Sequence, residues 1–227
     1  MDADTTGKKN AHEELLAAFG EHRADILMGT QMIAKGLDFE NVTLVGVLSA
    51  DQALYGDDFR SYERAFDLLT QVAGRAGRGQ YAGEAIIQTF TPENSVLALA
   101  ARQDYPAFYE GEIAVRKGML YPPFADLCVV GFVGIHEEKV ARASEAFLQM
   151  LRTLAQAEYP QEPMRVLNPS PALIGKVSNK YRYKLIVKCR NSRSFRQMIS
   201  RLLIAFAKER TFRDVTAFAD INPDRIL

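Results

Sequence analysis

The stretch Gln71-Val72-Ala73-Gly74-Arg75-Ala76-Gly77-Arg78 carries two arginines, three residues apart, in a glycine-rich segment. The residues before and at its start predict a helix, because four apolar side chains recur at helical spacing on one face: Tyr62, Phe66, Leu69 and Ala73. Gly74 predicts the helix end, since glycine readily takes the left-handed conformation that follows a last turn. Arg75 and Arg78 would then project from a bend, where their planar, always charged guanidinium groups suit a polyphosphate.

The segments around this helix predict an α/β fold. The run Val42–Leu48 is almost entirely apolar, which is typical of a parallel strand buried on both faces. Shorter strands are predicted at Asp25–Met28 and Glu84–Phe90, and residues 8–22 predict an amphipathic helix. Because strands and helices alternate, we expect a parallel sheet covered by helices. Ser49-Ala50-Asp51 would leave a strand at its carboxyl end, where such sheets place ligands.

Residues 29–39, with the sequence GTQMIAKGLDF, form a second candidate contact region. The Thr30 hydroxyl and nearby backbone amides can hold a nucleic-acid phosphate, because such contacts need only a small donor. Gly36 permits close backbone approach, and Asp38 can accept a hydrogen bond from a ribose hydroxyl or a phosphate-bound arginine. The alternative is an ordinary loop and short helix with Lys35 on its surface.

The composition is that of an ordinary globular protein, with 227 residues of which 48% are hydrophobic and 25% charged. No apolar run is long enough to span a membrane, and the N-terminus does not resemble a signal peptide. We therefore expect a cytoplasmic protein without a membrane partner. Cys128 and Cys189 are too few for a zinc site and have no histidine at ligand spacing, so no metal site is predicted and both thiols are expected to be buried.

Charge is distributed unevenly along the chain, although the net charge is zero. Residues 1–92 carry 8 basic and 14 acidic side chains, whereas residues 120–227 carry 17 basic and 10 acidic ones. The segment 163–208 has eleven basic residues and no acidic one. Such asymmetry indicates a nucleic-acid surface on the basic half.

The basic half, residues 120–227, predicts an α+β domain of ferredoxin-like (βαββαβ) plan, in which two helices cover one face of an antiparallel sheet. The expected strands and helices follow the order 127–133, 137–157, 164–167, 181–188, 192–208 and 215–219. Residues 93–119 predict a helical connector that Asn94 would cap. Pro122 and Pro123 would end it, because proline cannot continue a helix.

The third of these strands, Tyr181–Lys188, is the most informative element of the basic half. Successive side chains of a strand point to opposite faces, so one face would pack on the helices through Tyr181, Tyr183, Leu185 and Val187. The other face would carry basic residues on an open sheet that binds DNA: Arg182, Lys184 and Lys188. The alternative is a solvated basic face without a specific ligand.

Three further cations cluster at the start of the last helix: Arg190, Arg193 and Arg196. The helix dipole disfavours cations at this end, so their presence indicates an anionic partner. At the domain junction, Tyr121 and Phe124 are aromatic side chains that either pack there or stack on bases, and packing is the favoured interpretation.

The two motifs resemble motifs V and VI of superfamily 2 helicases, in this order and some forty residues apart. The resemblance extends along the chain through MDADTT, DDFRSYER and Tyr121-Pro122-Pro123-Phe124 to the C-terminal part of the primosomal replication-restart helicases. It implies an ATP-dependent 3′–5′ DNA helicase with two RecA-like lobes that acts at stalled forks. Residues 1–92 would form most of the second lobe.

The resemblance also implies roles for individual residues. Gln71, Arg75 and Arg78 would be catalytic, and Gly36 and Asp38 would join the two arginines in binding ATP with Mg²⁺. DNA would be contacted by Thr30, Lys35, Arg182, Lys184 and Lys188. The expected partners are forked or single-stranded DNA, the single-stranded DNA-binding protein and other primosome proteins. The acidic tail of the single-stranded DNA-binding protein would bind near Lys180, Arg182 and Lys184.

Motifs expected of a complete helicase are missing from the sequence. It contains no GxxxxGK[ST] phosphate loop, no DExH-type acidic motif and no cysteine-rich zinc module. We therefore expect a fragment that does not hydrolyse ATP by itself, with zinc bound only by a module outside this chain. The alternative is a stand-alone nucleic-acid or protein-binding module without motor activity.

Overall fold

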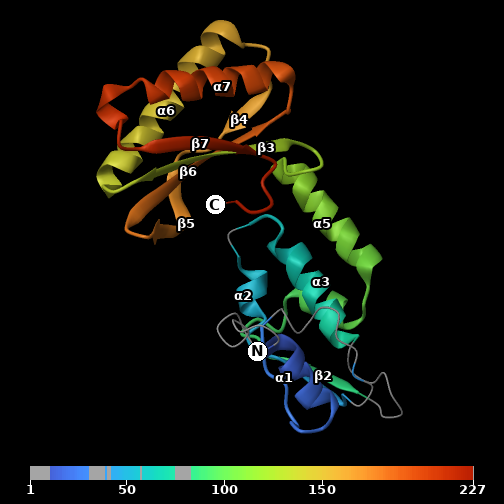
Figure 1. The fold of residues 1–227 in the computed structure, drawn as a ribbon. Helices are drawn as coiled ribbons and strands as arrows, with labels where there is room; N and C mark the ends of the chain where they lie inside the picture. The colour runs from blue at the N-terminus through green and yellow to red at the C-terminus, as the bar shows by residue number, and fades with distance from the viewer. Residues whose placement is uncertain (1–10, 31–38, 40–41, 57, 75–82, 227) are drawn as a thin grey trace. The chain divides into compact units, whose positions relative to one another are not determined.

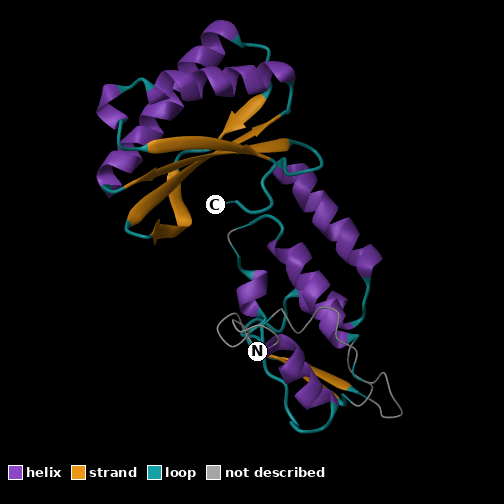
Figure 2. Ribbon diagram, viewed as in Figure 1, coloured by secondary structure: helices purple, strands orange, loops and turns teal. Residues whose placement is uncertain are grey.

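A computed structural model describes residues 11–30, 39, 42–56, 58–74 and 83–226 (Figure 1). The chain folds as two compact units, residues 1–112 and 113–227, and both combine helices with strands (Figure 2). The first unit contains a parallel strand pair and the second an antiparallel sheet. The predicted mixture of a parallel-sheet domain with an antiparallel α+β domain is therefore confirmed at this level.

In its described part, the first unit combines helices with a parallel strand pair. Its elements are α1 (Ala11–Gly20), β1 (Leu44–Val47), α2 (Asp51–Leu54), α3 (Ser61–Ala73), β2 (Glu84–Ile87), α4 (Ser95–Ala101) and α5 (Tyr105–Met119), the last of which continues into the second unit. Strands β1 and β2 pair in parallel from Leu44 opposite Glu84 to Val47 opposite Ile87. Helix α3 packs against both strands, as the alternation of strand and helix predicted.

Two strand predictions need correction. The run Val42–Leu48 was expected to be buried on both faces, but Leu44 is 57% exposed and Leu48 is 75% exposed. Alternate residues of β1 turn away from α3, so one face of the pair is open among the described residues. Asp25–Met28 is irregular and not a strand, and Ile26 is 84% exposed. Apolar composition alone therefore does not decide whether a segment joins a sheet.

Helix α3 confirms the helix predicted before the arginine pair, and its buried face is the predicted one in part. Phe66 and Leu69 are buried as predicted, together with Ser61, Ala65 and Val72, whereas Tyr62 is 39% exposed. Phe66 stacks on Phe108 of α5 with the ring centroids 4.2 Å apart, which ties both helices into one core. The helix ends at Gly74 as predicted, but Gly74 is right-handed, with φ −74°, so the left-handed explanation was wrong.

Residues 93–119, predicted to be helical, contain two helices, α4 and α5. The Asn94 side chain accepts a 3.0 Å hydrogen bond from the Val96 backbone N–H and so caps α4, which confirms the predicted cap. Helix α5 ends at Met119, just before the Pro122-Pro123 pair.

The second unit is an antiparallel sheet with two long helices on one face (Figure 1). Its elements are β3 (Asp126–Gly134), α6 (Glu137–Glu158), β4 (Met164–Val166), β5 (Ser170–Val177), β6 (Lys180–Cys189), α7 (Arg193–Ala207), the 3₁₀ helix η2 (Arg210–Phe212) and β7 (Thr216–Ile221). The strand order is β4-β6-β3-β7, and β5 pairs with β6. Strand β5 was not predicted, because Pro171 and Gly175 are poor strand residues and its pairing is irregular.

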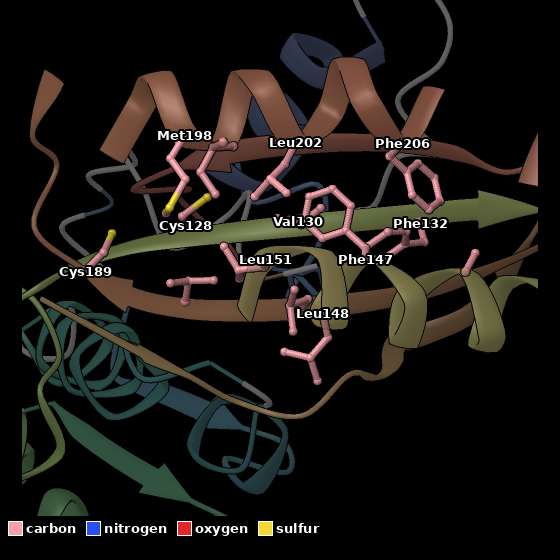
Figure 3. Close-up of a cluster of buried hydrophobic side chains, with 14 of the residues drawn as sticks. Cys128, Val130, Phe132, Phe147, Leu148, Leu151, Cys189, Met198, Leu202 and Phe206 are labelled. Carbon is pink, nitrogen blue, oxygen red and sulfur yellow. The ribbon is translucent and has the colours of Figure 1, made fainter. Parts of the chain in front are cut away.

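The core of this unit lies between the sheet and its two helices (Figure 3). Phe132 of β3, Phe147 of α6 and Phe206 of α7 meet edge to face, with ring centroids 5.5 to 6.0 Å apart. The free thiols of Cys128 and Cys189 are both buried, as predicted. Burial raises the pKa of each thiol to about 12, which keeps both protonated.

Candidate nucleotide and nucleic-acid interface

Only part of the predicted nucleotide site belongs to the described residues. Gln71 lies in the last turn of α3 and is exposed, and Thr30 is also exposed. The other predicted site residues of the two motifs lie outside the described residues: Lys35, Gly36, Asp38, Arg75 and Arg78. Their predicted roles at an ATP site and a DNA contact remain predictions.

The carboxyl ends of the parallel strands are joined by Asp51. Its carboxylate accepts hydrogen bonds from the Thr89 hydroxyl at 3.0 Å, the Phe90 backbone N–H at 3.1 Å and the Thr91 hydroxyl at 3.2 Å. Desolvation alone would raise the pKa of Asp51, but these hydrogen bonds outweigh it and lower the pKa below 3.8. Asp51 thus fastens the segment after β2 to the start of α2, on the side where a parallel sheet binds ligands.

The basic face predicted for β6 is only partly open, which is a correction. Leu185 and Val187 pack into the core as expected, and Tyr181 and Tyr183 pack against it. On the opposite face, however, Lys184 is 4% exposed and Lys188 is 6% exposed. The prediction that these two lysines present their charges on an open sheet is therefore wrong, because alternation fixes the face but not what covers it.

Lys188 is held by the segment that precedes the sheet. Its Nζ donates a 2.5 Å hydrogen bond to the Met119 carbonyl and lies 3.7 Å from the centroid of the Tyr121 ring. Burial, and secondarily Arg165, lowers the pKa of Lys188. The lysine links the end of α5 to β6. Tyr121 packs on Lys188 within the second unit, whereas Phe124, for which packing was also favoured, is 43% exposed.

Three basic side chains remain accessible on the β5–β6 hairpin. Lys176 and Lys180 are exposed and Arg182 is partly exposed. The Lys176 ammonium lies 4.7 Å from the centroid of the Tyr181 ring. Of the predicted DNA-binding and tail-binding residues on β6, only Lys180 and Arg182 are available to a ligand.

A second basic feature is a cavity of about 590 Å³ on helix α7. It is lined by Tyr159, Arg193, Arg196, Gln197, Ser200 and Arg201. Arg196 is oriented by hydrogen bonds to Asn191, 2.9 Å to its side-chain oxygen and 3.2 Å to its carbonyl. Arg201 is oriented by a bidentate contact with Glu158, at 2.6 and 2.9 Å, and by the Tyr159 hydroxyl at 3.0 Å.

Sequence reasoning selected Arg193 and Arg196 but missed Arg201. The signal was present, because the polar cavity residues of α7 recur at helical spacing from Arg193 to Arg201 and thus share one exposed face. The contribution of Tyr159 from the end of α6 could not be read from the sequence, since it depends on how the two helices pack. Arg190, grouped with the other two arginines, does not line the cavity.

The described residues offer no cluster of three or more histidine, cysteine or acidic side chains that could hold a metal ion. No helix in this part of the chain is long and apolar enough to cross a membrane.

Comparison with known families assigns a class to each half of the chain. Residues 3–80 match the helicase conserved C-terminal domain, and residues 117–224 match the primosomal protein N C-terminal domain. Strand β1 and helix α3 lie in the first match, β2 follows it directly, and the whole antiparallel sheet lies in the second. A helicase-type domain followed by this C-terminal domain defines the class of protein.

Relatives of known name cover nearly all of the chain. It is 44% identical to the replication restart protein PriA of Bacillus subtilis over 225 residues, which is 98% of the chain and 27% of that relative. It is 38% identical to PriA of Chlamydia muridarum over 223 residues, which is 98% of the chain and 29% of that relative. It is 42% identical to PriA of Synechocystis over 188 residues, which is 83% of the chain and 22% of that relative. The chain belongs to the PriA family of replication restart proteins. It spans less than a third of the length of these relatives.

Proposed function

We propose that this chain is the C-terminal part of an ATP-dependent 3′–5′ DNA helicase that acts in the cytoplasm on stalled forks during replication restart. Residues 1–92 would be most of the second RecA-like lobe, residues 93–119 a helical connector and residues 120–227 a ferredoxin-like domain that binds DNA and primosome proteins. The order β4-β6-β3-β7, with antiparallel neighbours and both helices on one face, supports the ferredoxin-like assignment.

The observation that carries the motor assignment is the placement of α3. This helix packs on a parallel strand pair and ends at Gly74, directly before Arg75. Gln71 is exposed in the last turn, next to the two arginines in sequence, so a nucleotide phosphate at this helix end would meet amide and guanidinium donors. ATP with Mg²⁺ would supply the phosphoryl group, whose charge Arg75 and Arg78 would stabilise while it is transferred.

ATP hydrolysis tests this assignment. The 227-residue chain is expected to show no turnover, because its sequence lacks a phosphate loop. In a longer polypeptide that carries the upstream region, Arg78→Ala is expected to abolish DNA-stimulated ATPase activity while DNA affinity stays within about twofold, since an arginine at the transferred phosphoryl group accounts for about 10³–10⁵ in rate. Turnover by the short chain, lost in Arg78→Ala, would refute the fragment interpretation.

The competing function is a stand-alone nucleic-acid or protein-binding module. The acid-free basic segment, residues 163–208, favours binding under either hypothesis. The two hypotheses differ in what they expect of the longer polypeptide. A binding module would bind forked DNA without hydrolysing ATP, whereas a helicase would couple DNA binding to ATP hydrolysis.

For the protein partner, we propose that the acidic tail of the single-stranded DNA-binding protein binds the α7 cavity. Three arginines line it. Arg196 is already oriented by Asn191, so less side-chain entropy would be lost when it binds a carboxylate, whereas Arg201 is already paired with Glu158. The predicted site near Lys180 and Lys184 is less suitable, because Lys184 is buried.

A synthetic acidic tail peptide distinguishes the two locations. Arg193→Ala and Arg196→Ala should each weaken peptide binding about fivefold, since a charged contact at an exposed site is worth up to about 1 kcal/mol. Lys180→Ala and the matched control Arg142→Ala, on exposed α6, should leave the affinity within about twofold. Loss of binding in Lys180→Ala alone would place the tail on the hairpin instead.

A further inference from the structure

The β5–β6 hairpin carries an unusual bulge. Pro171 pairs with Tyr183 and Lys176 with Tyr181, so four residues, Ala172–Gly175, lie opposite the single residue Arg182. Ala172 of the bulge is buried. Its two large apolar side chains are exposed to solvent, Leu173 by 66% and Ile174 by 60%.

Protection of a sheet edge does not account for this bulge. Edge strands are commonly blunted by bulges, but the side chains they present are charged, because exposed apolar groups would promote the association that the bulge prevents. Two adjacent exposed aliphatic side chains on a projecting edge instead favour a ligand with an apolar face.

The surroundings of the bulge are cationic. Lys176 and Lys180 are exposed on either side of the turn Ser178-Asn179, and Arg182 lies opposite the bulge. Both turn residues have positive φ, 48° and 62°, as expected of a tight two-residue hairpin turn, which fixes the two lysines relative to each other. No acidic residue occurs between positions 163 and 208, so the charge complement of this hairpin is a polyanion.

We propose that the β5–β6 hairpin binds DNA where base pairs open, with Leu173 and Ile174 placed against an unstacked base and Lys176, Lys180 and Arg182 against the flanking phosphates. Aliphatic side chains inserted at a base step are an established way for proteins to hold distorted DNA, and basic residues beside them hold the backbone. This inference rests on the proposed DNA-binding function and assigns the contact residues.

The test uses the 227-residue chain and a forked oligonucleotide with 2-aminopurine at the junction, together with a fully paired duplex of the same length. Two variants separate the contributions: Leu173→Ser/Ile174→Ser and Lys176→Gln/Lys180→Gln/Arg182→Gln. Their matched controls lie elsewhere on the same unit: Ile204→Ser, which is 56% exposed, and Arg142→Gln/Arg152→Gln/Lys208→Gln, which removes three exposed charges. Circular dichroism and thermal melting confirm that each variant is folded.

The apolar variant should weaken fork binding about tenfold, abolish the 2-aminopurine signal change and leave duplex binding and the salt slope unaltered. The basic variant should weaken fork and duplex binding together and reduce the slope of log K against log salt by about two to three, since about 0.9 is lost for each phosphate contact. Both controls should stay within about twofold of the parent.

Each contrary result has a distinct meaning. An unchanged 2-aminopurine signal and fork preference in the apolar variant would overturn the placement of Leu173 and Ile174 against an unstacked base. A basic variant that behaves like its charge-matched control would overturn the hairpin as the DNA site while leaving DNA binding by the chain intact. Failure of the parent chain to bind either oligonucleotide would overturn the DNA-binding function itself. Normal DNA binding by the apolar variant with lost binding of a protein ligand would assign the bulge to that protein.

Discussion

The Nζ of Lys188 lies over the Tyr121 ring, 3.7 Å from its centroid, and donates to the Met119 carbonyl. One buried ammonium therefore fixes the segment between α5 and β3 against the middle of the sheet. A lysine that is 6% exposed in this position acts within the protein, whereas its sequence position had suggested a DNA contact.

Replacing Lys188 with methionine should destabilise the second unit by about 1–3 kcal/mol, because the Met119 carbonyl would lose its buried donor while apolar volume is largely kept. Urea denaturation followed by circular dichroism measures the change. Lys180→Met, at an exposed site, should stay within about 0.5 kcal/mol of the parent. Equal effects of the two variants would contradict the proposed role of Lys188.

The contrast between the β6 residues explains what could be predicted from sequence. Period-two alternation correctly assigned Leu185 and Val187 to the core, because the pleat alone sets the face. The burial of Lys184 and Lys188 on the opposite face could not be predicted. For Lys188 it depends on Met119 and Tyr121, which are distant in sequence and reach the strand only through the tertiary fold.

Helix positions were predicted closely, because they too depend on local spacing along the sequence. Apolar spacing fixed α3, α6 and α7, and the Asn94 cap fixed the start of α4. The strand predicted at Asp25–Met28 is wrong, because strand formation depends on the tertiary surroundings more than on composition.

The thiols of Cys128 and Cys189 should be unreactive in the native protein at pH 8. Burial raises the pKa of each to about 12, so the thiolate is scarce and shielded, and modification should require unfolding. The rate of reaction with a chromogenic disulfide reagent, measured with and without urea, tests this. Ser200→Cys, introduced at an exposed site of α7, should react at once as a positive control. Rapid native labelling of the parent protein would show that the core around β3 opens readily.

Asp51→Asn should destabilise the first unit more at pH 7 than at pH 3. Hydrogen bonds lower the folded pKa of Asp51 below 3.8, so its contribution to stability is present above the unfolded pKa and is lost as the pH falls through the folded pKa. Urea unfolding of parent and variant at pH 7, 5 and 3 measures this difference.

Asp67 provides a control with the opposite sign. Partial burial, and secondarily Glu63, raises the pKa of Asp67, so ionisation opposes folding as the pH rises past 3.8. Asp67→Asn should therefore raise the free energy of unfolding above that of the parent more at pH 7 than at pH 3. The same sign of pH dependence in both variants would count against the hydrogen-bond assignment of Asp51.

Gly134→Ala should destabilise the second unit by about 1–3 kcal/mol through overpacking. A Cβ at Gly134 would lie 2.8 Å from Val140 Cγ2 and 3.3 Å from Val215 Cγ2, and Val140, on α6, is fully buried in the core. Because the clash is chiefly with one side chain, adding Val140→Ala should recover part of the loss, which a double-mutant cycle would report as a coupling of about 1 kcal/mol.

Gly111→Ala is the control, since a Cβ there meets nothing within 4 Å and the site lies inside helix α5. It should stabilise the protein by about 0.5–1 kcal/mol, the usual gain when alanine replaces glycine in a helix. Additive effects of Gly134→Ala and Val140→Ala would show that the crowding is relieved by backbone movement instead.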